Sequence, residues 1–158
     1  RSYRRARLSI IVMTAMVYVQ LYLGALVAGL RAGYIYNTWP LIDGVLLPAR
    51  ERLWFETPWW RNLFENMLMV QFNHRMMAYA LLAVALWHAY ESWRHKQAQP
   101  LAAMILASVI VQIALGVATL LLIVPLGIAL AHQAVALIVL TLCVFQVAQL
   151  SRAGRRSQ

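Results

Sequence analysis

The sequence predicts an all-α integral membrane protein: an up-and-down bundle of four transmembrane helices, with a short interfacial helix in its first outer loop. Three observations support this fold class. Hydrophobic residues make up 63% of the 158 residues, charged residues only 12%, and the mean hydropathy is +0.65. A soluble domain is about 45–50% apolar and about 25% charged. A globular protein of this length could not bury the additional apolar surface of this chain. Ordinary soluble enzymes, disordered linkers and disulfide scaffolds are therefore excluded.

Four apolar runs are long enough to cross a bilayer, which takes about 20 residues in a helix. They cover residues 8–30, about 67–93, about 101–124 and about 126–150. Three of the runs are uncharged, whereas the second has polar residues near its start and Glu91 near its end. We expect these runs to form a single domain over 1–158, with an outer loop at 31–66 and a tight turn around Pro125.

The basic residues predict the orientation. They gather at the N-terminus, in the turn after the second run and at the C-terminus, and an even number of spans places these three points on one side. By the positive-inside rule that side is the cytoplasm, so both termini are predicted to be cytoplasmic. Because these charges flank apolar runs, the net charge of +9 does not indicate nucleic acid, and we expect no nucleic-acid partner. The clusters are Arg1, Arg4, Arg5 and Arg7; Arg94 and Lys96; and Arg152, Arg155 and Arg156.

The outer loop carries a helix-start pattern. Thr57 offers an N-cap and Pro58 the first helical position, followed by apolar residues at helical spacing. We predict a short amphipathic helix at the outer membrane surface, with Trp54, Trp59 and Trp60 as interfacial aromatics. The alternative is a plain N-terminal extension of the second span.

Two histidines are the strongest functional candidates, because ionisable groups inside a bilayer are costly and mark functional sites. His74 and His132 lie near the outer ends of the second and fourth spans, which run in the same direction. These spans are diagonal partners in an up-and-down bundle, about 12–14 Å apart. That distance is too wide for direct contact between imidazoles and suits a metalloporphyrin held edge-on. Small residues, Gly116 among them, thin the third and fourth spans beside this space.

Haem is favoured over zinc at this site. Zinc takes three or four ligands, and no Cys, Asp or Glu lies at this depth to complete its shell. Two imidazoles fill both axial positions of a haem iron, which suits electron transfer or structure rather than oxygen binding. Hydrogen-bonded core histidines without a cofactor remain the alternative.

Neighbouring polar residues have candidate roles. Arg75 is expected to pair with a haem propionate, the alternative being contact with lipid phosphates. Gln71 either binds a propionate or ring substituent or faces a neighbouring helix. His88 has no histidine counterpart on the fourth span, where Gln146 occupies the matching position, so we expect it to cap its helix or pair with Glu91 rather than bind a second haem. His95 is expected to be solvated in the cytoplasmic turn.

The sequence resembles the C-terminal half of the haem A synthase family, which matures haem for cytochrome oxidase. The resemblance covers nearly the whole chain and depends on a combination of motifs in the right order. These are residues 24–33 (GALVAGLRAG), 36–44 (YNTWPLIDG), 66–75 (NMLMVQFNHR) and 116–120 (GVATL), and His132-Gln133.

The resemblance implies a protein of eight spans in the bacterial cytoplasmic membrane, built from two similar four-helix halves. The C-terminal half holds haem b, and His74 and His132 match its ligands. The N-terminal half holds haem O, whose ring methyl is oxidised to a formyl group. That half carries a glutamate one turn before its first histidine, where this chain has Gln71. We therefore expect no catalytic residue in this chain, and we expect the lipid bilayer, the N-terminal half, haem O synthase and cytochrome oxidase assembly factors as partners.

The start at Arg1 is expected to lie at a linker inside a longer protein. Without the other half of that protein, oxidation of haem O would be in doubt.

Two alternative functions stay open. The main one is a free-standing b-type electron-transfer cytochrome, and the other is a helical assembly subunit without a cofactor.

Overall fold

The computed structural model describes residues 2–156, which form an all-helical structure. The long helices are α1 (Ser2–Gly29), α4 (Met67–Arg94), α5 (Gln99–Leu121) and α6 (Leu126–Arg156). The segment between α1 and α4 holds α2 (Ala32–Ile35), α3 (Arg50–Leu53) and a 3-10 helix, η1 (Trp59–Leu63). All four predicted apolar runs therefore fall on long helices.

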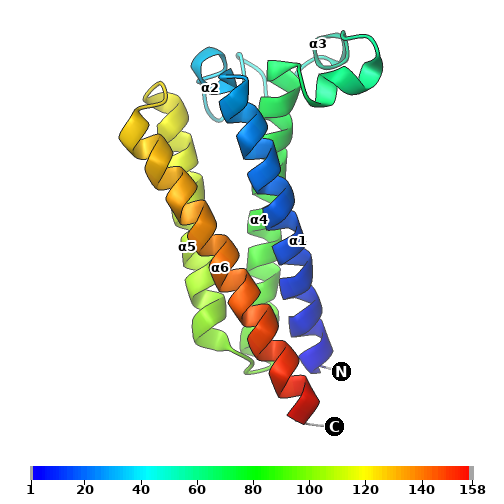
Figure 1. Ribbon diagram of the computed structural model, residues 1–158, viewed down its shortest axis with the longest axis vertical. Coiled ribbons are helices and arrows are strands. Elements are labelled where there is room, and N and C mark those ends of the chain that lie inside the picture. Colours follow the sequence, from blue (N-terminus) through cyan, green and yellow to red (C-terminus); the bar gives the residue numbers. More distant parts are fainter. Residues whose placement is uncertain (1, 157–158) are drawn as a thin grey trace.

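The long helices pack in a ring. Helix α1 packs against α4 and α6, and α5 packs against the same two helices. Neighbouring helices run in opposite directions (Figure 1). Helices α4 and α6 are therefore opposite rather than adjacent to each other.

Three of the helices within the described residues are long and apolar enough to cross a membrane: Arg4–Gly29 of α1, Gln99–Leu121 of α5 and Leu126–Arg152 of α6. Helix α4 has the length but not the hydropathy, because it carries polar residues at both ends. Several of them, Gln71, Arg75 and His88 among them, are buried inside the molecule. The chain is thus a multi-pass membrane protein, and a fourth crossing by α4 stays a prediction.

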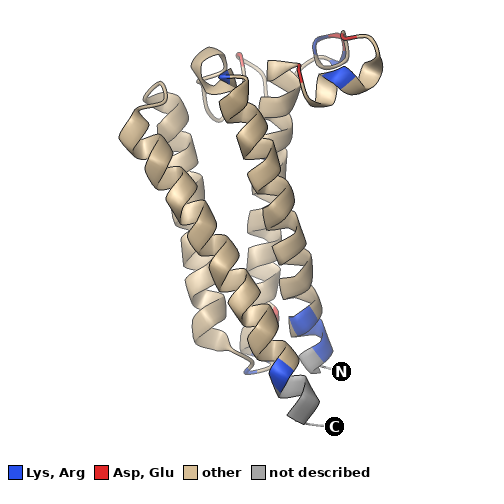
Figure 2. Ribbon diagram, viewed as in Figure 1, with Lys and Arg blue, Asp and Glu red and all other residues tan. Residues whose placement is uncertain are grey.

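The two ends of the molecule differ in charge. Both termini and the α4–α5 turn lie at one end, called here the terminal end, and the 31–66 loop and the α5–α6 turn lie at the other, called the loop end (Figure 1). Figure 2 shows basic residues at the terminal end, both signs of charge at the loop end, and long uncharged stretches between them. The positive-inside rule assigns the orientation of a membrane protein from basic residues gathered at one end in this way. Arg1 and the side chains of Arg155 and Arg156, which contributed to that prediction, lie outside the described residues.

The predicted turn around Pro125 is present, but α5 ends at Leu121 rather than at residue 124. Ile123 and Val124 have φ angles of 59° and 55°, in the left-handed region that β-branched residues rarely adopt. Two left-handed residues break the helix and turn the chain so that α6 begins directly after Pro125.

The outer loop differs from its prediction. Thr57 and Pro58 do not start an α-helix, because the segment that follows, η1, is a 3-10 helix of five residues without a side-chain cap. The buried Asn62 side chain accepts a hydrogen bond from the Glu56 amide and donates to the carbonyls of Glu56 and Trp59, which holds this tight turn closed.

Asn66 is the N-cap of α4, which the sequence pattern did not single out. Its Oδ1 accepts hydrogen bonds from the amides of Leu68 and Met69 at 3.0 and 3.2 Å. Its Nδ2 donates to the carbonyls of Arg52 and Leu53 at 3.0 and 3.2 Å. One buried side chain therefore starts α4 and fastens α3 to it.

We expect Asn66→Ala to destabilise the loop end, because it removes a helix cap and leaves buried backbone groups without partners. The expected loss is about 2 kcal/mol, measured as a lower melting temperature and as faster proteolysis within 45–65. Asn66→Asp keeps the cap acceptor and loses the amide donor, so it should lie between alanine and the wild type. Identical melting and cleavage for all three proteins would show that Asn66 does not fasten the loop.

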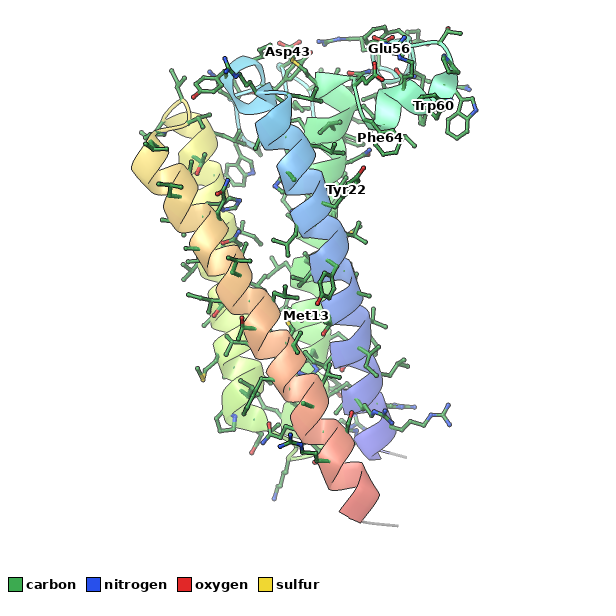
Figure 3. The ribbon with its side chains drawn as sticks, in the orientation of Figure 1. Met13, Tyr22, Asp43, Glu56, Trp60 and Phe64 are labelled. Atoms are coloured by element: carbon green, nitrogen blue, oxygen red, sulfur yellow. The ribbon has the colours of Figure 1, made fainter. Side chains whose placement is uncertain are left out.

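The loop end carries both charged and exposed aromatic side chains. Figure 3 shows Asp43 and Glu56 at the outer limit of the molecule, Phe64 below the segment that holds α3 and η1, and Trp60 at the far edge of that segment. Trp60 is 48% exposed and Phe64 39% exposed. The Arg61 guanidinium donates hydrogen bonds to Glu65 and holds the pKa of that carboxyl below its usual value. The arrangement agrees with an interfacial location for this segment, which stays a prediction.

Candidate functional site

His74 and His132 lie in α4 and α6 at the loop end, each within the first eight residues of its helix. The two helices are opposite members of the ring. The structure therefore places the two histidines at the same end of the molecule, on opposite helices.

The buried apolar side chains of α5 and α6 lie on the terminal-end side of the histidines. Buried apolar side chains of α5 end at Val109, and those of α6 begin at Val139, within the residues whose burial is described. Figure 1 shows the α5–α6 pair diverging from the α1–α4 pair toward the loop end. At the terminal end the helices enclose a core that includes the fully buried Met13, labelled in Figure 3. The two helix pairs are therefore held together mainly between the histidines and the terminal end.

His132 is oriented by the neighbouring helix α5. Its Nδ1 lies 3.1 Å from the carbonyl oxygen of Gln112, to which a protonated Nδ1 would donate. This leaves Nε2 unprotonated, and that atom lies 3.5 Å from the Gln112 side-chain amide. An imidazole held in this way through a backbone carbonyl is typical of metal-ligating histidines.

His74 is held by α1, but less firmly. The Gln20 side chain donates to the main-chain carbonyl of His74 at 3.1 Å. The Nδ1 atom of the ring is buried without a hydrogen-bond partner among the described residues. The ring is therefore positioned by contacts with its surroundings rather than by a hydrogen bond.

Two glycines lie against these rings. A β-carbon at Gly24 of α1 would lie 3.2 Å from Cε1 of His74, and one at Gly116 of α5 would lie 2.9 Å from Cε1 of His132. The sequence interpretation used Gly116 only to thin its helix beside a porphyrin. The structure shows that it makes room for the histidine itself. Sequence reasoning missed Gln20, Gly24 and Gln112, although the segment Gln-x-x-x-Gly occurs in both α1 and α5 and could have revealed them.

Arg75 and Gln71 both bind the outer loop. The Gln71 amide donates to the Tyr36 carbonyl at 2.7 Å. The Arg75 guanidinium donates to the same carbonyl at 3.1 Å and to the Leu41 carbonyl at 3.3 Å. Both side chains are buried, and Nε of Arg75 has no hydrogen-bond partner among the described residues. These residues therefore fasten the loop to α4, and one charged donor remains free for another acceptor.

The expectations for His88 and His95 were wrong. His88 does not pair with Glu91: it is fully buried, and its Nδ1 lies 2.8 Å from the Ser9 hydroxyl of α1. Glu91 instead pairs with His95 at 3.2 Å, one helical turn further on, so His95 is not simply solvated. The difference arises because α4 turns His88 toward α1 and α6, whereas Glu91 faces the α4–α5 turn.

Comparisons with known proteins identify relatives of this chain. The family model described as cytochrome oxidase assembly protein matches residues 1–144. The chain is similar to the heme A synthase of Rhodopseudomonas palustris strain HaA2, with 55% identity over 149 residues, and to that of Bradyrhizobium diazoefficiens, with 56% identity over 149 residues. Each alignment covers 93% of this chain and 41% of the relative, so the chain spans about two-fifths of the length of these proteins. No solved structure matches the chain.

Proposed function

This chain belongs to the haem A synthase family of cytochrome oxidase assembly proteins, and we propose that it is the haem-b-binding, C-terminal part of a haem A synthase. One observation carries the proposal. His74 and His132 come from opposite helices at the loop end of the molecule, each with its ring against a glycine of the neighbouring helix. In this proposal they are the axial ligands of a single haem b.

The donor set fits an iron porphyrin better than a bare metal ion. No group of three or more His, Cys, Asp or Glu side chains comes together among the described residues, whereas zinc requires three or four ligands. A haem iron takes four nitrogens from its own ring and needs only two from the protein. The hydrogen bond between His132 and the Gln112 carbonyl would leave Nε2 of that imidazole available to the iron.

Haem b held by these two histidines would supply an iron able to change its oxidation state by one electron. The chain's own residues would orient the two imidazoles and exclude water from the apolar walls of α5 and α6. Arg75 would bind a propionate through its free Nε while its other nitrogens hold the outer loop. Gln71 would support the same carbonyl of Tyr36, and it is a weaker candidate for direct contact with the haem.

The activity proposed for the whole protein is oxidation of the haem O methyl group to the formyl group of haem A, for use by cytochrome c oxidase. Haem O would bind in an N-terminal four-helix part, and this chain alone would be catalytically incomplete. The proposed setting is the bacterial cytoplasmic membrane, with both ends of this chain on the cytoplasmic side. Haem O synthase and oxidase assembly factors are the proposed partners. Haem b would either pass electrons or stabilise the fold.

The test is a haem analysis of the protein expressed from its complete gene in a strain without its own haem A synthase. Extraction and pyridine haemochrome spectra should identify haem b in the purified protein, with a low-spin reduced spectrum. Haem A should form in the same cells. A folded, membrane-inserted protein without haem b would refute the proposal. Haem b without haem A formation would instead favour a free-standing b-type cytochrome.

A further inference from the structure

The surroundings of the two histidines repeat each other. On α1, Gln20 precedes Gly24 by one turn, and this segment contacts His74 of α4. On α5, Gln112 precedes Gly116 by one turn, and this segment contacts His132 of α6. In both cases the glycine faces Cε1 of the ring. The glycine contact with the ring therefore occurs once in each helix pair, whereas the glutamine contacts differ: the Gln20 side chain donates to the His74 carbonyl, and the Gln112 carbonyl lies beside Nδ1 of His132.

The repeat extends along the full helix pairs. Buried positions of α1 recur in α5 at one constant offset in the numbering, and buried positions of α4 recur in α6 at another. The packing between the two pairs agrees with this correspondence, because α1 packs against α6 and its counterpart α5 packs against α4, the counterpart of α6. The corresponding buried residues are Ile10 and Ala102, Met13 and Ile105, Val17 and Val109, and, on the second helices, Leu81 and Val139, Ala85 and Cys143, and His88 and Gln146.

This correspondence points to an approximate twofold relation between α1–α4 and α5–α6, with the two histidines as equivalent positions. Under such a relation each imidazole is placed by the glycine-bearing helix of its own pair. The close approach to an imidazole is not shared by other glycines of the long helices. A β-carbon at Gly29 of α1 or at Gly127 of α6 would have no neighbouring atom within 4 Å.

The two glycines differ in how far the adjacent histidine ring can move to make room for a β-carbon. At Gly116 a β-carbon would lie 2.9 Å from the ring of His132, and the ring cannot rotate away without losing its bond to the Gln112 carbonyl. At Gly24 the distance is 3.2 Å, and the ring of His74 makes no hydrogen bond that would resist a small shift. A methyl group at 116 should therefore displace its imidazole more than a methyl group at 24.

We infer that Gly24 and Gly116 are positioning residues, which admit the two imidazoles to the interior and set the direction of each ring, Gly116 being the more stringent. Their use in aligning both rings on one haem iron depends on the function proposed above. The placement of the rings themselves does not, so the two can be tested separately.

The experiment compares Gly116→Ala and Gly24→Ala with the matched controls Gly29→Ala and Gly127→Ala, in the protein expressed from its complete gene. The first measurement uses haem-free protein and follows hydrogen–deuterium exchange at Cε1 of each histidine by mass spectrometry. Gly116→Ala should raise the exchange rate of His132 severalfold, and Gly24→Ala should raise that of His74 by less. Neither control should change either rate.

The second measurement is the optical spectrum of the haem-loaded proteins. Gly116→Ala should lower haem b affinity about 10- to 100-fold and convert remaining haem from low spin to high spin, because one axial ligand is misplaced. Gly24→Ala should have a smaller effect, and the controls should keep the low-spin spectrum. Circular dichroism checks that all four proteins keep their helix content.

The outcomes separate the two proposals. A changed exchange rate in a protein that never binds haem b would support the positioning role and refute the proposed function. Wild-type exchange and a low-spin spectrum in Gly116→Ala would overturn the positioning role and leave the proposed function standing. Equal effects of Gly116→Ala and Gly127→Ala would also overturn it, because the contact with His132 would not then matter.

Discussion

Replacing either His74 or His132 with alanine is expected to abolish the low-spin haem b spectrum of the protein. With one imidazole gone, the iron keeps a single protein ligand, and any haem that stays bound becomes five-coordinate and high spin. The measurement is the reduced-minus-oxidised spectrum together with the haem b content of the purified protein. The two variants should behave alike, because the two histidines occupy equivalent places in α4 and α6.

His88→Ala is the matched control for this prediction. His88 lies in the same helix as His74, fourteen residues further on and about 21 Å deeper. It is held by Ser9 and not by the loop end. Its loss should lower the melting temperature, since the buried Ser9 hydroxyl loses one of its two partners and keeps only the Ala6 carbonyl, and should leave the spectrum low spin. A low-spin spectrum that survives His74→Ala or disappears only in His88→Ala would place the haem elsewhere.

Arg75→Leu is expected to affect both stability and haem retention. The guanidinium donates to two loop carbonyls, and hydrogen bonds from charged groups each contribute about 1.5–3 kcal/mol. The variant should therefore melt at a lower temperature, with a loosened 31–45 segment. If Nε also binds a propionate, haem b should dissociate about tenfold faster or more, while the low-spin spectrum stays, because both ligands are intact.

Two further variants separate these effects. Gln71→Leu removes the other donor to the Tyr36 carbonyl without removing a charge, so it should weaken the loop and not the retention of haem. Arg50→Leu removes an exposed positive charge from the loop end and should change neither. Equal haem loss in Gln71→Leu and Arg75→Leu would mean that the loop, and not a propionate contact, retains the haem.

The sequence predicted the helical part of this structure closely. The run expected at about 67–93 is helix α4, Met67–Arg94, although its crossing of a bilayer stays a prediction. The residue at which a helix stops was less predictable. Residues 122–124 are as apolar as the helix before them, so the hydropathy pattern did not show that α5 ends at Leu121, before the left-handed residues Ile123 and Val124.

Contacts across the molecule were the least predictable. The spacing from His88 to Glu91 suggested a pair, yet His88 binds Ser9, which is 79 residues away in the chain. A residue's partner depends on the rotation of its helix and on which helix lies beside it, and neither is encoded in local spacing. The same reason explains why Gln20 and Gly24 were missed, since they contact His74 only after α1 packs against α4.

The sequence by itself determined that this chain is a bundle-forming set of apolar helices, with His74 and His132 near one end, because hydropathy and charge position act locally along the chain. Only the tertiary structure decided how those histidines are held. It set Gly116 and the Gln112 carbonyl against one ring and Gly24 against the other, turned Arg75 toward the outer loop, and buried His88 in the opposite half. These choices depend on the packing of helices that are distant in sequence, where a β-carbon added at Gly116 would come within 2.9 Å of the His132 ring.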